Sequence, residues 1–357
     1  MRLSHFAAFA PRCPVCVGAG RQPDPLVLAS AAARDDGAIH EGILHCPLCQ
    51  HEYPVLDGVP VIVPDLRRLI AERGLELLLR DDLDPALESL FGDAMGPESW
   101  FDAVRQTQSG YGWDAYADLD PEEPPGEDPP PGAARRCLAR LLALLAQAHS
   151  PDLVLDAGCA AGRTSFDLAA AHPGALVLGI DRHLGLIRMA AAAARGRISY
   201  PRRRIGLVYD RRRFDVALPG TERVDFWACD ALALPVAPGA IGLAVALNLL
   251  DCVPDPRRLL ESLAAAVTPG GGILLATPYD WSTRATPVEA WLGGHSQRAA
   301  HRGAGEAILH ALLDPAAPNS VPGLRCHAED THWPWQTRLH DRSLVRYRTH
   351  LLALTRD

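Results

Sequence analysis

Short apolar runs alternate with stretches of helical periodicity in the second half of the chain. Five runs are short enough to be buried strands, at residues 153–156, 175–180, 224–228, 241–247 and 272–276. Helical stretches precede or separate them at about residues 133–148, 163–171 and 255–267. Strands that alternate with helices form a parallel sheet with helices on both faces, so we predict an α/β fold.

The first 65 residues follow a different pattern, which predicts a small β-rich unit. It contains strand-like runs at residues 38–44 and 53–63, and Asp57-Gly58 in the second run marks a hairpin turn. Apolar residues at helical spacing then predict a mostly helical segment up to residue 107: Leu66, Leu69, Ile70, Leu77 and Leu78. Residues 114–132 are acidic and rich in proline, which is typical of an extended or mobile linker.

Composition and charge narrow the class of protein. The 357 residues, 48% of them hydrophobic, can build a sizeable core and predict more than one domain. We expect these at residues 1–65, 66–132 and 133–357, the last with an entry segment from about residue 108. No apolar run is long enough to cross a membrane, and the start lacks a signal peptide, so we expect a soluble, cytoplasmic protein. The net charge of −8 disfavours nucleic acid as the partner.

Four of the nine cysteines form two Cys-x-x-Cys pairs. The pairs are Cys13 with Cys16 and Cys46 with Cys49. In a reducing compartment such pairs favour a metal over disulfides, and four thiolates suit a tetrahedral, structural Zn²⁺ site. The loop between the pairs is longer than usual, and a redox pair or a lost metal are the alternatives.

A glycine-containing loop follows the first predicted strand of the α/β region. Its sequence is Asp156-Ala157-Gly158-Cys159-Ala160-Ala161-Gly162, and glycines here let the backbone approach a ligand closely. Asp181 ends the second strand, where a carboxylate can bind ribose hydroxyls. Asp230 follows the third strand, where a side chain can meet an adenine amino group. Together these residues predict a nucleoside-type cofactor.

This set resembles the class I S-adenosylmethionine (SAM)-dependent methyltransferases. The turn Thr268-Pro269-Gly270-Gly271-Gly272 before the fifth strand is also similar to that family. The resemblance implies a Rossmann-like class I methyltransferase sheet with helices on both faces. It implies that SAM is bound by Asp156, Gly158, Cys159, Gly162, Asp181, Arg182, Asp230, Ala231 and Asn248.

Two later segments narrow the expected substrate. They are Asn248-Leu249-Leu250-Asp251 and Pro278-Tyr279-Asp280-Trp281, with Trp291-Leu292-Gly293-Gly294 after them. They resemble the methyltransferase domain of ovothiol biosynthesis, which methylates an imidazole nitrogen of mercaptohistidine (5-thiohistidine). The resemblance implies Asp251 and Tyr279 as catalytic groups that orient the ring or accept its proton. It also implies substrate contacts from Tyr111, Tyr116, Asn248, Trp281, Trp333 and Arg338.

The sequence departs from the ovothiol methyltransferases in two ways, and the polar residues also have a purely structural interpretation. Trp333 and Trp335 stand where that family has smaller apolar residues, and the amino-terminal unit is foreign to it. The polar residues at the strand ends could instead serve capping and packing, and Asp251 could be a loop cap. The substrate could therefore be a relative of mercaptohistidine.

The amino-terminal unit and an arginine-rich hairpin keep other functions open. Residues 53–60 resemble the small zinc-ribbon activator subunit of tRNA and translation-factor methyltransferases, and a similar ribbon precedes some ribosomal-RNA methyltransferases. Residues 202–204 and 211–213 are all arginine and flank a predicted hairpin turn. We prefer an N-methyltransferase for a small imidazole, as a monomer or homodimer. The alternatives are an RNA methyltransferase and a non-catalytic SAM-binding activator of a partner protein.

Overall fold

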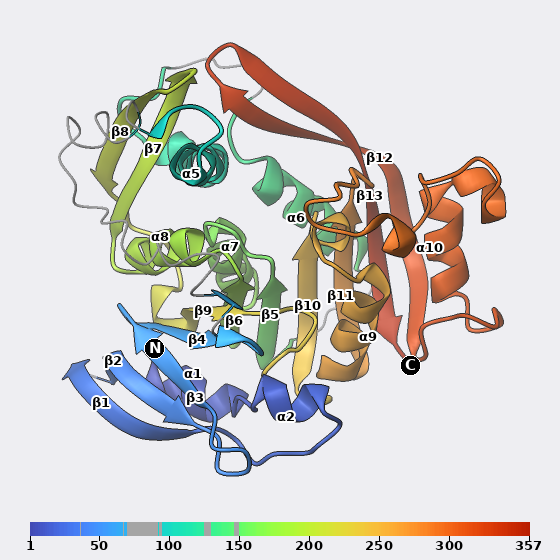
Figure 1. Ribbon diagram of the computed structural model, residues 1–357, viewed down its shortest axis with the longest axis horizontal. Helices are drawn as coiled ribbons and strands as arrows, with labels where there is room; N and C mark the ends of the chain where they lie inside the picture. Colours follow the sequence, from blue (N-terminus) through green and yellow to red (C-terminus); the bar gives the residue numbers. More distant parts are fainter. Residues whose placement is uncertain (36, 67, 70–91, 93–94, 125–129, 146–149) are drawn as a thin grey trace.

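The computed structural model describes the whole chain except residues 36, 67, 70–91, 93–94, 125–129 and 146–149. In the described residues, eleven strands form one sheet in the order β1-β2-β3-β4-β9-β6-β5-β10-β11-β13-β12 (Figure 1). These strands are β1 (Val27–Asp35), β2 (Ala38–His45), β3 (Glu52–Leu56), β4 (Val59–Ile62), β5 (Leu153–Ala157), β6 (Leu176–Asp181), β9 (Val224–Cys229), β10 (Ile241–Leu247), β11 (Val267–Thr277), β12 (Leu324–His340) and β13 (Ser343–Arg356).

The centre of the sheet is the predicted parallel α/β unit. The strands β9, β6, β5, β10 and β11 are parallel to one another, whereas β13 pairs antiparallel with β11. The chain runs outward from β5 through β6 to β9 and then returns to β10 on the other side of β5. Such a reversal opens a crevice at the carboxyl ends of the strands, where open α/β sheets bind ligands.

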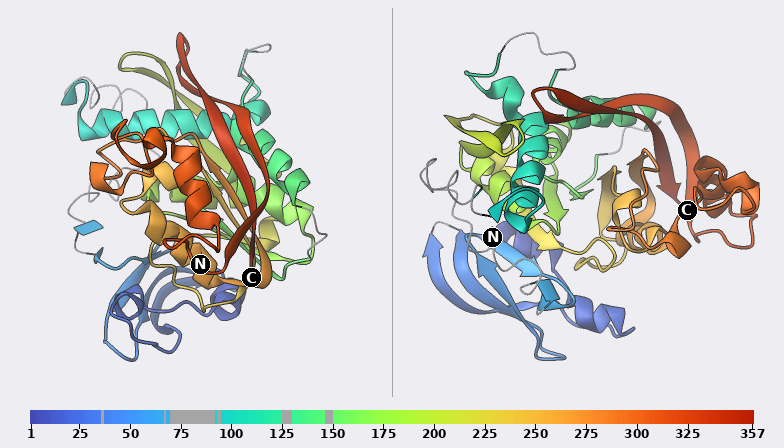
Figure 2. Two further views of the ribbon diagram at one scale, coloured as in Figure 1. Left: turned by 90° about the vertical axis from the view of Figure 1, so that its right-hand side faces the viewer. Right: turned by 45° about the horizontal axis from the view of Figure 1, so that its top comes forward.

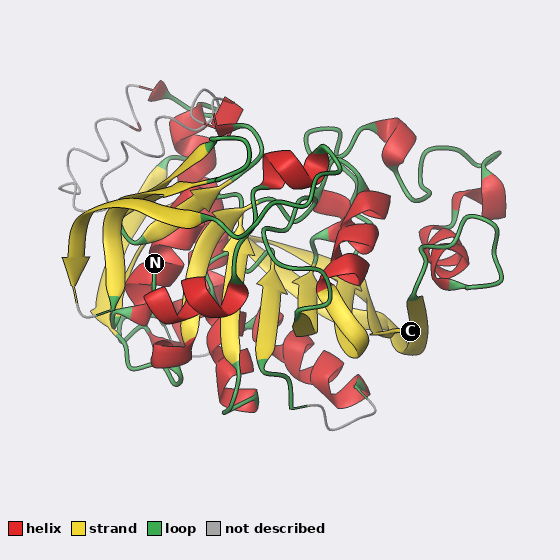
Figure 3. Ribbon diagram, turned by 90° about the horizontal axis from the view of Figure 1, so that it is seen from below, coloured by secondary structure: helices red, strands yellow, loops and turns green. Residues whose placement is uncertain are grey.

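Helices cover both faces of the sheet, as predicted (Figure 3). Val154 and Val177 pack in a core with the first group of helices, and their neighbours Leu155 and Leu178 pack in a second core with the other group. The first group is α5 (Trp100–Tyr116), α6 (Ala133–Leu144), α7 (Arg163–Ala171) and α8 (Leu184–Ala194). The second is α1 (Leu3–Phe9), α2 (Pro14–Gly18), α9 (Pro256–Ala266) and α10 (Gly305–Leu313). Successive side chains along a strand point to opposite faces of the sheet. Because helices cover each face, neighbouring apolar residues are buried in different cores.

The amino-terminal strands continue the central sheet. Asp57 and Gly58 have φ of 50° and 82°, which confirms the predicted turn between β3 and β4. β4 then pairs parallel with β9, at Val61 with Ala228 and Ile62 with Cys229. The β-rich unit is therefore hydrogen-bonded directly to the α/β unit.

Two antiparallel hairpins complete the fold (Figure 2). The strands β7 (Arg197–Ile205) and β8 (Val208–Asp215) form the predicted arginine-rich hairpin as a separate two-stranded sheet. β12 and β13 form a long hairpin at the edge of the main sheet, and β12 reaches across to contact α5 and β7. The far end of this hairpin thus lies over the carboxyl ends of the central strands.

The region between the two units matches its prediction in part, because α5 begins at Trp100, inside the segment that was predicted to be helical. Most of the expected helix at residues 66–107, including Ile70, Leu77 and Leu78, lies outside the described residues. Residues 114–116 end α5 rather than beginning a linker, and Asp120 and Glu123 are held by ion pairs to the hairpin. Proline and acidic residues suggested mobility, but the acidic side chains have fixed partners far away in sequence. Residues 125–129 of this stretch lie outside the described residues.

Candidate active site

A cavity of about 730 Å³ opens at the carboxyl ends of the parallel strands. Its wall comes from the loops after β5, β6, β9, β10 and β11, from α5, and from the far part of the β12–β13 hairpin. Most of the sequence-predicted site residues line it: Asp156, Gly158, Cys159, Asp181, Arg182, Asp230, Ala231, Asn248, Asp251, Tyr111 and Arg338. Among these predicted residues, Tyr111 and Arg338 are 227 positions apart in the sequence, and the fold places both in the wall of one cavity.

The two glycines of the loop after β5 have different reasons to be glycine. Gly158 lines the cavity with φ of 75°, and a Cβ there would lie 3.0 Å from Leu249 Cδ1. Gly162 has φ of 84°, and a Cβ there would lie 2.6 Å from Phe226 Cε1. Gly162 is not among the lining residues, and its lack of a side chain allows α7 to begin against the sheet and α8.

The carboxylate of Asp181 is held by the backbone of the loops around it. Its Oδ2 accepts a hydrogen bond from the Ala160 N–H at 3.1 Å, and its Oδ1 accepts one from the His183 N–H at 2.8 Å. Each carboxylate oxygen has two lone pairs, so both oxygens can still accept hydrogen bonds from a ligand. A carboxylate held in this way can bind hydroxyl groups of a ligand.

Asp156 is buried beneath the loop. Its Oδ2 accepts hydrogen bonds from the hydroxyls of Thr164 and Ser165, both at 2.7 Å. Burial raises the pKa of Asp156 to about 6, because the ionised carboxylate loses its hydration. Both donors contact the same oxygen, which leaves Oδ1 for the cavity that Asp156 lines.

Two lining residues other than glycine have left-handed backbone. Ala160 has φ of 48° and Asn248 has φ of 49°. Such backbone is uncommon outside glycine and costly for Ala, although Asn adopts it more readily, and strained positions cluster at sites where a ligand binds. The Oδ1 atom of Asn248 is buried and has no hydrogen-bond partner among the described residues. An acceptor left unpaired in the cavity wall fits a polar ligand, so the residues present suit SAM.

Asp251 follows β10 in the short turn Leu250–Cys252 and lines the same cavity. Its Oδ2 accepts a hydrogen bond from the Asp280 N–H at 2.8 Å, which ties the loop after β10 to the loop after β11. Only 1% of the residue is exposed, and burial raises the pKa of Asp251 to about 6. At neutral pH the carboxylate is therefore ionised but close to its protonation range.

Four predicted substrate or catalytic residues are not among those that line the cavity: Tyr116, Tyr279, Trp281 and Trp333. The Tyr116 hydroxyl donates to the Ala161 carbonyl at 2.6 Å, below the wall. The Tyr279 hydroxyl is 2.8 Å from His350 Nδ1, and Trp281 stacks on Trp291 with ring centroids 6.2 Å apart. Trp333 packs against the core that contains α5 to α8. The side-chain directions in these segments depend on the fold around them.

Several lining residues were missed as site residues. They include Gln106, Thr107, Asp114, His183, Asp280, His340 and Tyr347. Asp280 carried a signal, because it is next to Tyr279 in the same motif. Trp335 and Tyr347 lie directly opposite each other on β12 and β13, a pairing that the sequence alone does not disclose.

The four cysteines of the amino-terminal unit converge. Their sulfur atoms all lie within 4.8 Å of one another, with Cys13 and Cys49 3.4 Å apart and Cys16 and Cys46 4.0 Å apart. A tetrahedral ion with zinc–sulfur distances of about 2.3 Å places its ligands about 3.8 Å apart, which this set matches. All four are free thiols. The donor set therefore suits Zn²⁺.

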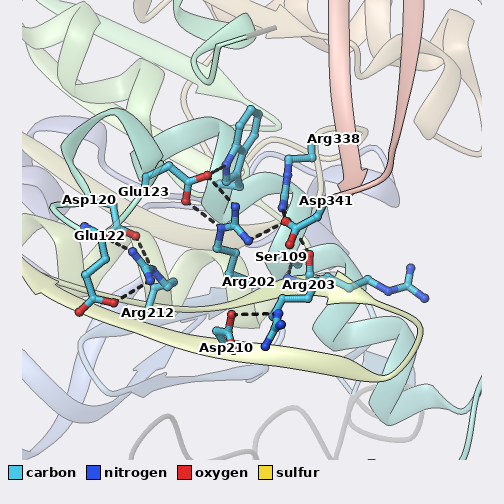
Figure 4. A network of polar contacts seen from close by, with 12 residues as sticks. Ser109, Asp120, Glu122, Glu123, Arg202, Arg203, Asp210, Arg212, Arg338 and Asp341 are labelled. Carbon is cyan, nitrogen blue, oxygen red and sulfur yellow. Dashed lines mark hydrogen bonds and ion pairs between the residues drawn. The ribbon is translucent and has the colours of Figure 1, made fainter. Parts of the chain in front are cut away.

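The arginine-rich hairpin faces acidic side chains (Figure 4). Arg202 donates to both carboxylate oxygens of Glu123, at 2.8 and 3.0 Å. Arg212 donates to both oxygens of Asp120, at 2.6 and 2.7 Å. Both ion pairs are largely buried, so these arginines serve to dock the acidic segment rather than to bind phosphates.

The comparisons with known proteins decide the family. Residues 132–312, just over half of the chain, match the family model described as a methyltransferase domain. The chain belongs to the methyltransferase domain family. The matched region contains β5 to β11 and most of the cavity wall, and its domain is that of a SAM-dependent methyltransferase. Among the described helices, none has the length and apolar character needed to cross a bilayer.

The chain is also similar, more distantly, to other proteins. A ubiquinone biosynthesis O-methyltransferase of Coxiella burnetii is 28% identical over 124 residues, which are 35% of this chain and 42% of that protein. The chain thus spans about two fifths of the length of this curated relative. A SAM-dependent methyltransferase of Methanosarcina mazei is 20% identical with a TM-score of 0.38, over 58% of this chain and 93% of that one. A chain from the complex of the Haloferax volcanii Trm112 methyltransferase activator with a methyltransferase is 17% identical with a TM-score of 0.37, over 63% and 88%.

Proposed function

We propose that the protein is a SAM-dependent N-methyltransferase for a small imidazole such as 5-thiohistidine. The observation that carries this proposal is the placement of Asp251. Its buried carboxylate lines the same cavity as the predicted cofactor residues and lies only three residues after Asn248. An acceptor in this position suits a small ring that carries an N–H group.

The cofactor half of the cavity would be formed by the loops after β5, β6 and β9. Asp181 would accept hydrogen bonds from the ribose hydroxyls, and Asp230, which lines the same cavity, would meet the adenine amino group. Asn248 Oδ1 would gain the partner that it lacks among the described residues. When bound, SAM supplies an activated methyl group on a sulfonium. The protein's task is then to bind, align and exclude water.

Asp251 would orient the substrate ring. A neutral imidazole offers a lone pair on one nitrogen and an N–H on the other, so no strong base is needed to start transfer. Asp251 would accept the N–H and fix the opposite nitrogen in line with the methyl group. After transfer the ring is cationic, and Asp251, with its pKa raised by burial to about 6, can hold the proton that the ring releases. Tyr111, Trp335 and Tyr347 line the cavity and would provide planar surfaces for the ring.

We also propose a structural Zn²⁺ ion at Cys13, Cys16, Cys46 and Cys49. The sulfur spacing and the burial of three of the four residues support it. The ion would replace the core that so small a β-rich unit cannot build alone. The resemblance of this unit to a methyltransferase activator makes a scaffold for the catalytic domain its proposed role, since β4 pairs directly with β9.

Release of S-adenosylhomocysteine tests the substrate proposal. The protein would be assayed in parallel with 5-thiohistidine, with histidine and with total RNA. We expect turnover with 5-thiohistidine and none with RNA. Asp251→Asn should lower kcat/KM about 10²-fold, because the amide cannot accept the proton and presents an N–H on one side. Asp210→Asn, on the exposed edge of the β7–β8 hairpin, is the matched control and should leave the rate unchanged.

Other outcomes would contradict the proposal in different ways. Turnover on RNA alone would favour an RNA methyltransferase. If the protein binds SAM but methylates neither 5-thiohistidine, nor histidine, nor RNA, then it is an activator of a partner protein or its substrate is another metabolite. An Asp251→Asn variant with the rate of the unaltered protein would remove Asp251 from the mechanism.

A further inference from the structure

A second cluster of metal-ligand residues lies outside the cavity and the cysteine site. It consists of His310 on α10, Glu329 on β12 and His350 on β13, whose donor atoms all lie within 4.8 Å of one another. Glu329 Oε2 is 2.7 Å from His310 Nε2 and 2.9 Å from His350 Nε2. Three elements that are separate in sequence thus direct one carboxylate and two imidazole nitrogens at a common point, where α10 lies against the β12–β13 hairpin (Figure 1).

The Tyr279 hydroxyl completes the arrangement on the buried side. It lies 2.8 Å from Nδ1 of His350, the ring nitrogen that does not face Glu329. Histidines that bind metals through one nitrogen almost always hydrogen-bond the other, which fixes the ring and its tautomer. The His350 side chain is 1% exposed, so the surrounding residues hold its ring in place between Glu329 and Tyr279.

The spacing and access also suit a metal ion. Ligands at about 2.0–2.1 Å from a tetrahedral Zn²⁺ lie about 3.3 Å apart, roughly half an ångström more than the observed nitrogen–oxygen distances. His310 and Glu329 have side chains that are 45% and 37% exposed, so they can make this small adjustment and an ion can enter from solvent. Two histidines and one glutamate leave a fourth position for water, a known zinc ligand set.

We propose that His310, Glu329 and His350 form a binding site for a divalent transition-metal ion, with Zn²⁺ as the best fit. The ion would fasten α10 to the β12–β13 hairpin. Through His350 it would also hold Tyr279, whose backbone has a left-handed φ of 56°. Asp280, the next residue, lines the cavity and hydrogen-bonds Asp251. The site thereby braces the loop that carries the substrate side of the cavity, and its existence does not depend on which substrate is methylated.

Metal counting on the full-length protein tests the proposal. The metal-free protein would be titrated with Zn²⁺ alone, and separately with Co²⁺, whose strong thiolate absorption reports only the cysteine site. We expect His310→Ala and Glu329→Gln each to bind one equivalent less Zn²⁺ than the unaltered protein, with the Co²⁺–thiolate absorption unchanged. Both replaced side chains are partly exposed, so the variants should fold. His332→Ala is the matched control, because His332 is an exposed histidine on β12, the strand that carries Glu329. This variant should bind as many equivalents of Zn²⁺ as the unaltered protein.

Tyr279→Phe gives a second test that keeps the ring and removes only the hydroxyl. Loss of such a partner should weaken Zn²⁺ binding at this site by about 10- to 100-fold and leave the cysteine site unaffected. The proposal is overturned if His310→Ala and Glu329→Gln bind the same number of Zn²⁺ equivalents as the unaltered protein. An affinity unchanged in Tyr279→Phe would remove Tyr279 from the site.

Discussion

At the scale of single residues, Asp156 shows that burying an ionised carboxylate in the site lowers the stability of the folded protein. Its carboxylate is 1% exposed and is stabilised by two hydroxyl donors, yet burial still raises its pKa to about 6. The folded protein therefore binds this proton more tightly than the unfolded chain does. The stability associated with Asp156 is present at acidic pH and is lost as the pH rises from about 4 to about 6.

Asp156→Asn should remove this pH dependence. The amide oxygen can still accept from Thr164 and Ser165, because both hydroxyls contact one oxygen. We expect the variant to gain stability relative to the unaltered protein between pH 4 and pH 7, by about 2–3 kcal/mol for a shift of this size. Denaturant unfolding at both pH values measures the difference. A difference that stays constant with pH would contradict the raised pKa.

Residues at or just after the ends of regular strands could be located from the sequence, whereas the partners of side chains farther along the loops could not. Asp181, Asp230 and Asp251 follow recognisable strands, and the parallel sheet places all three in one cavity wall. Tyr279 lies in a loop with left-handed backbone, which turns its side chain towards His350. Nothing near Tyr279 in the sequence indicates this partner, because His350 is 71 residues away.

At the scale of elements, the acidic segment and the arginine-rich hairpin stabilise each other. Arg212 and Asp120 are both largely buried and share two short hydrogen bonds. Breaking such a pair leaves a charge without its partner in a poorly hydrated place. The sequence showed each charge cluster, but it could not show that they contact each other over about 90 residues.

Asp120→Asn should therefore destabilise the protein by about 3 kcal/mol. Asp210→Asn is the matched control, because its ion pair with Arg204 lies on the same hairpin but is about half exposed. That exposed pair should contribute less than about 1 kcal/mol. Urea unfolding of both variants gives the comparison, and equal losses of stability would contradict the docking role of the buried pair.

At the scale of the whole molecule, the amino-terminal unit and the catalytic sheet form one continuous structure. β4 pairs with β9, and Cys13, Cys16 and Cys46 belong to the same apolar core as α9 and the strands of the catalytic sheet. The sequence predicted both parts, because each has its own local pattern. The joint between them could not be predicted, since pairing of β4 with β9 is a contact over more than 160 residues.

Cys13→Ser should reduce the Zn²⁺ content by one equivalent and lower the Tm of the whole protein in a single transition. The single transition is expected because the shared sheet and core couple the two units. Cys137→Ala, a buried cysteine of α6 outside both metal-ligand clusters, should keep the full metal content. Calorimetry with metal analysis provides both readouts. Two separate transitions would show that the amino-terminal unit unfolds independently.

The central claim is that the cavity at the carboxyl ends of the strands binds SAM, and calorimetric titration of Asp181→Ala with SAM tests it most directly. Asp181 holds two loops and would accept the ribose hydroxyls, so we expect SAM to bind about 10- to 100-fold more weakly. Asp215→Ala, an exposed residue at the end of β8, should bind SAM as the unaltered protein does. Equal affinity in Asp181→Ala and the unaltered protein would contradict the placement of the cofactor in this cavity.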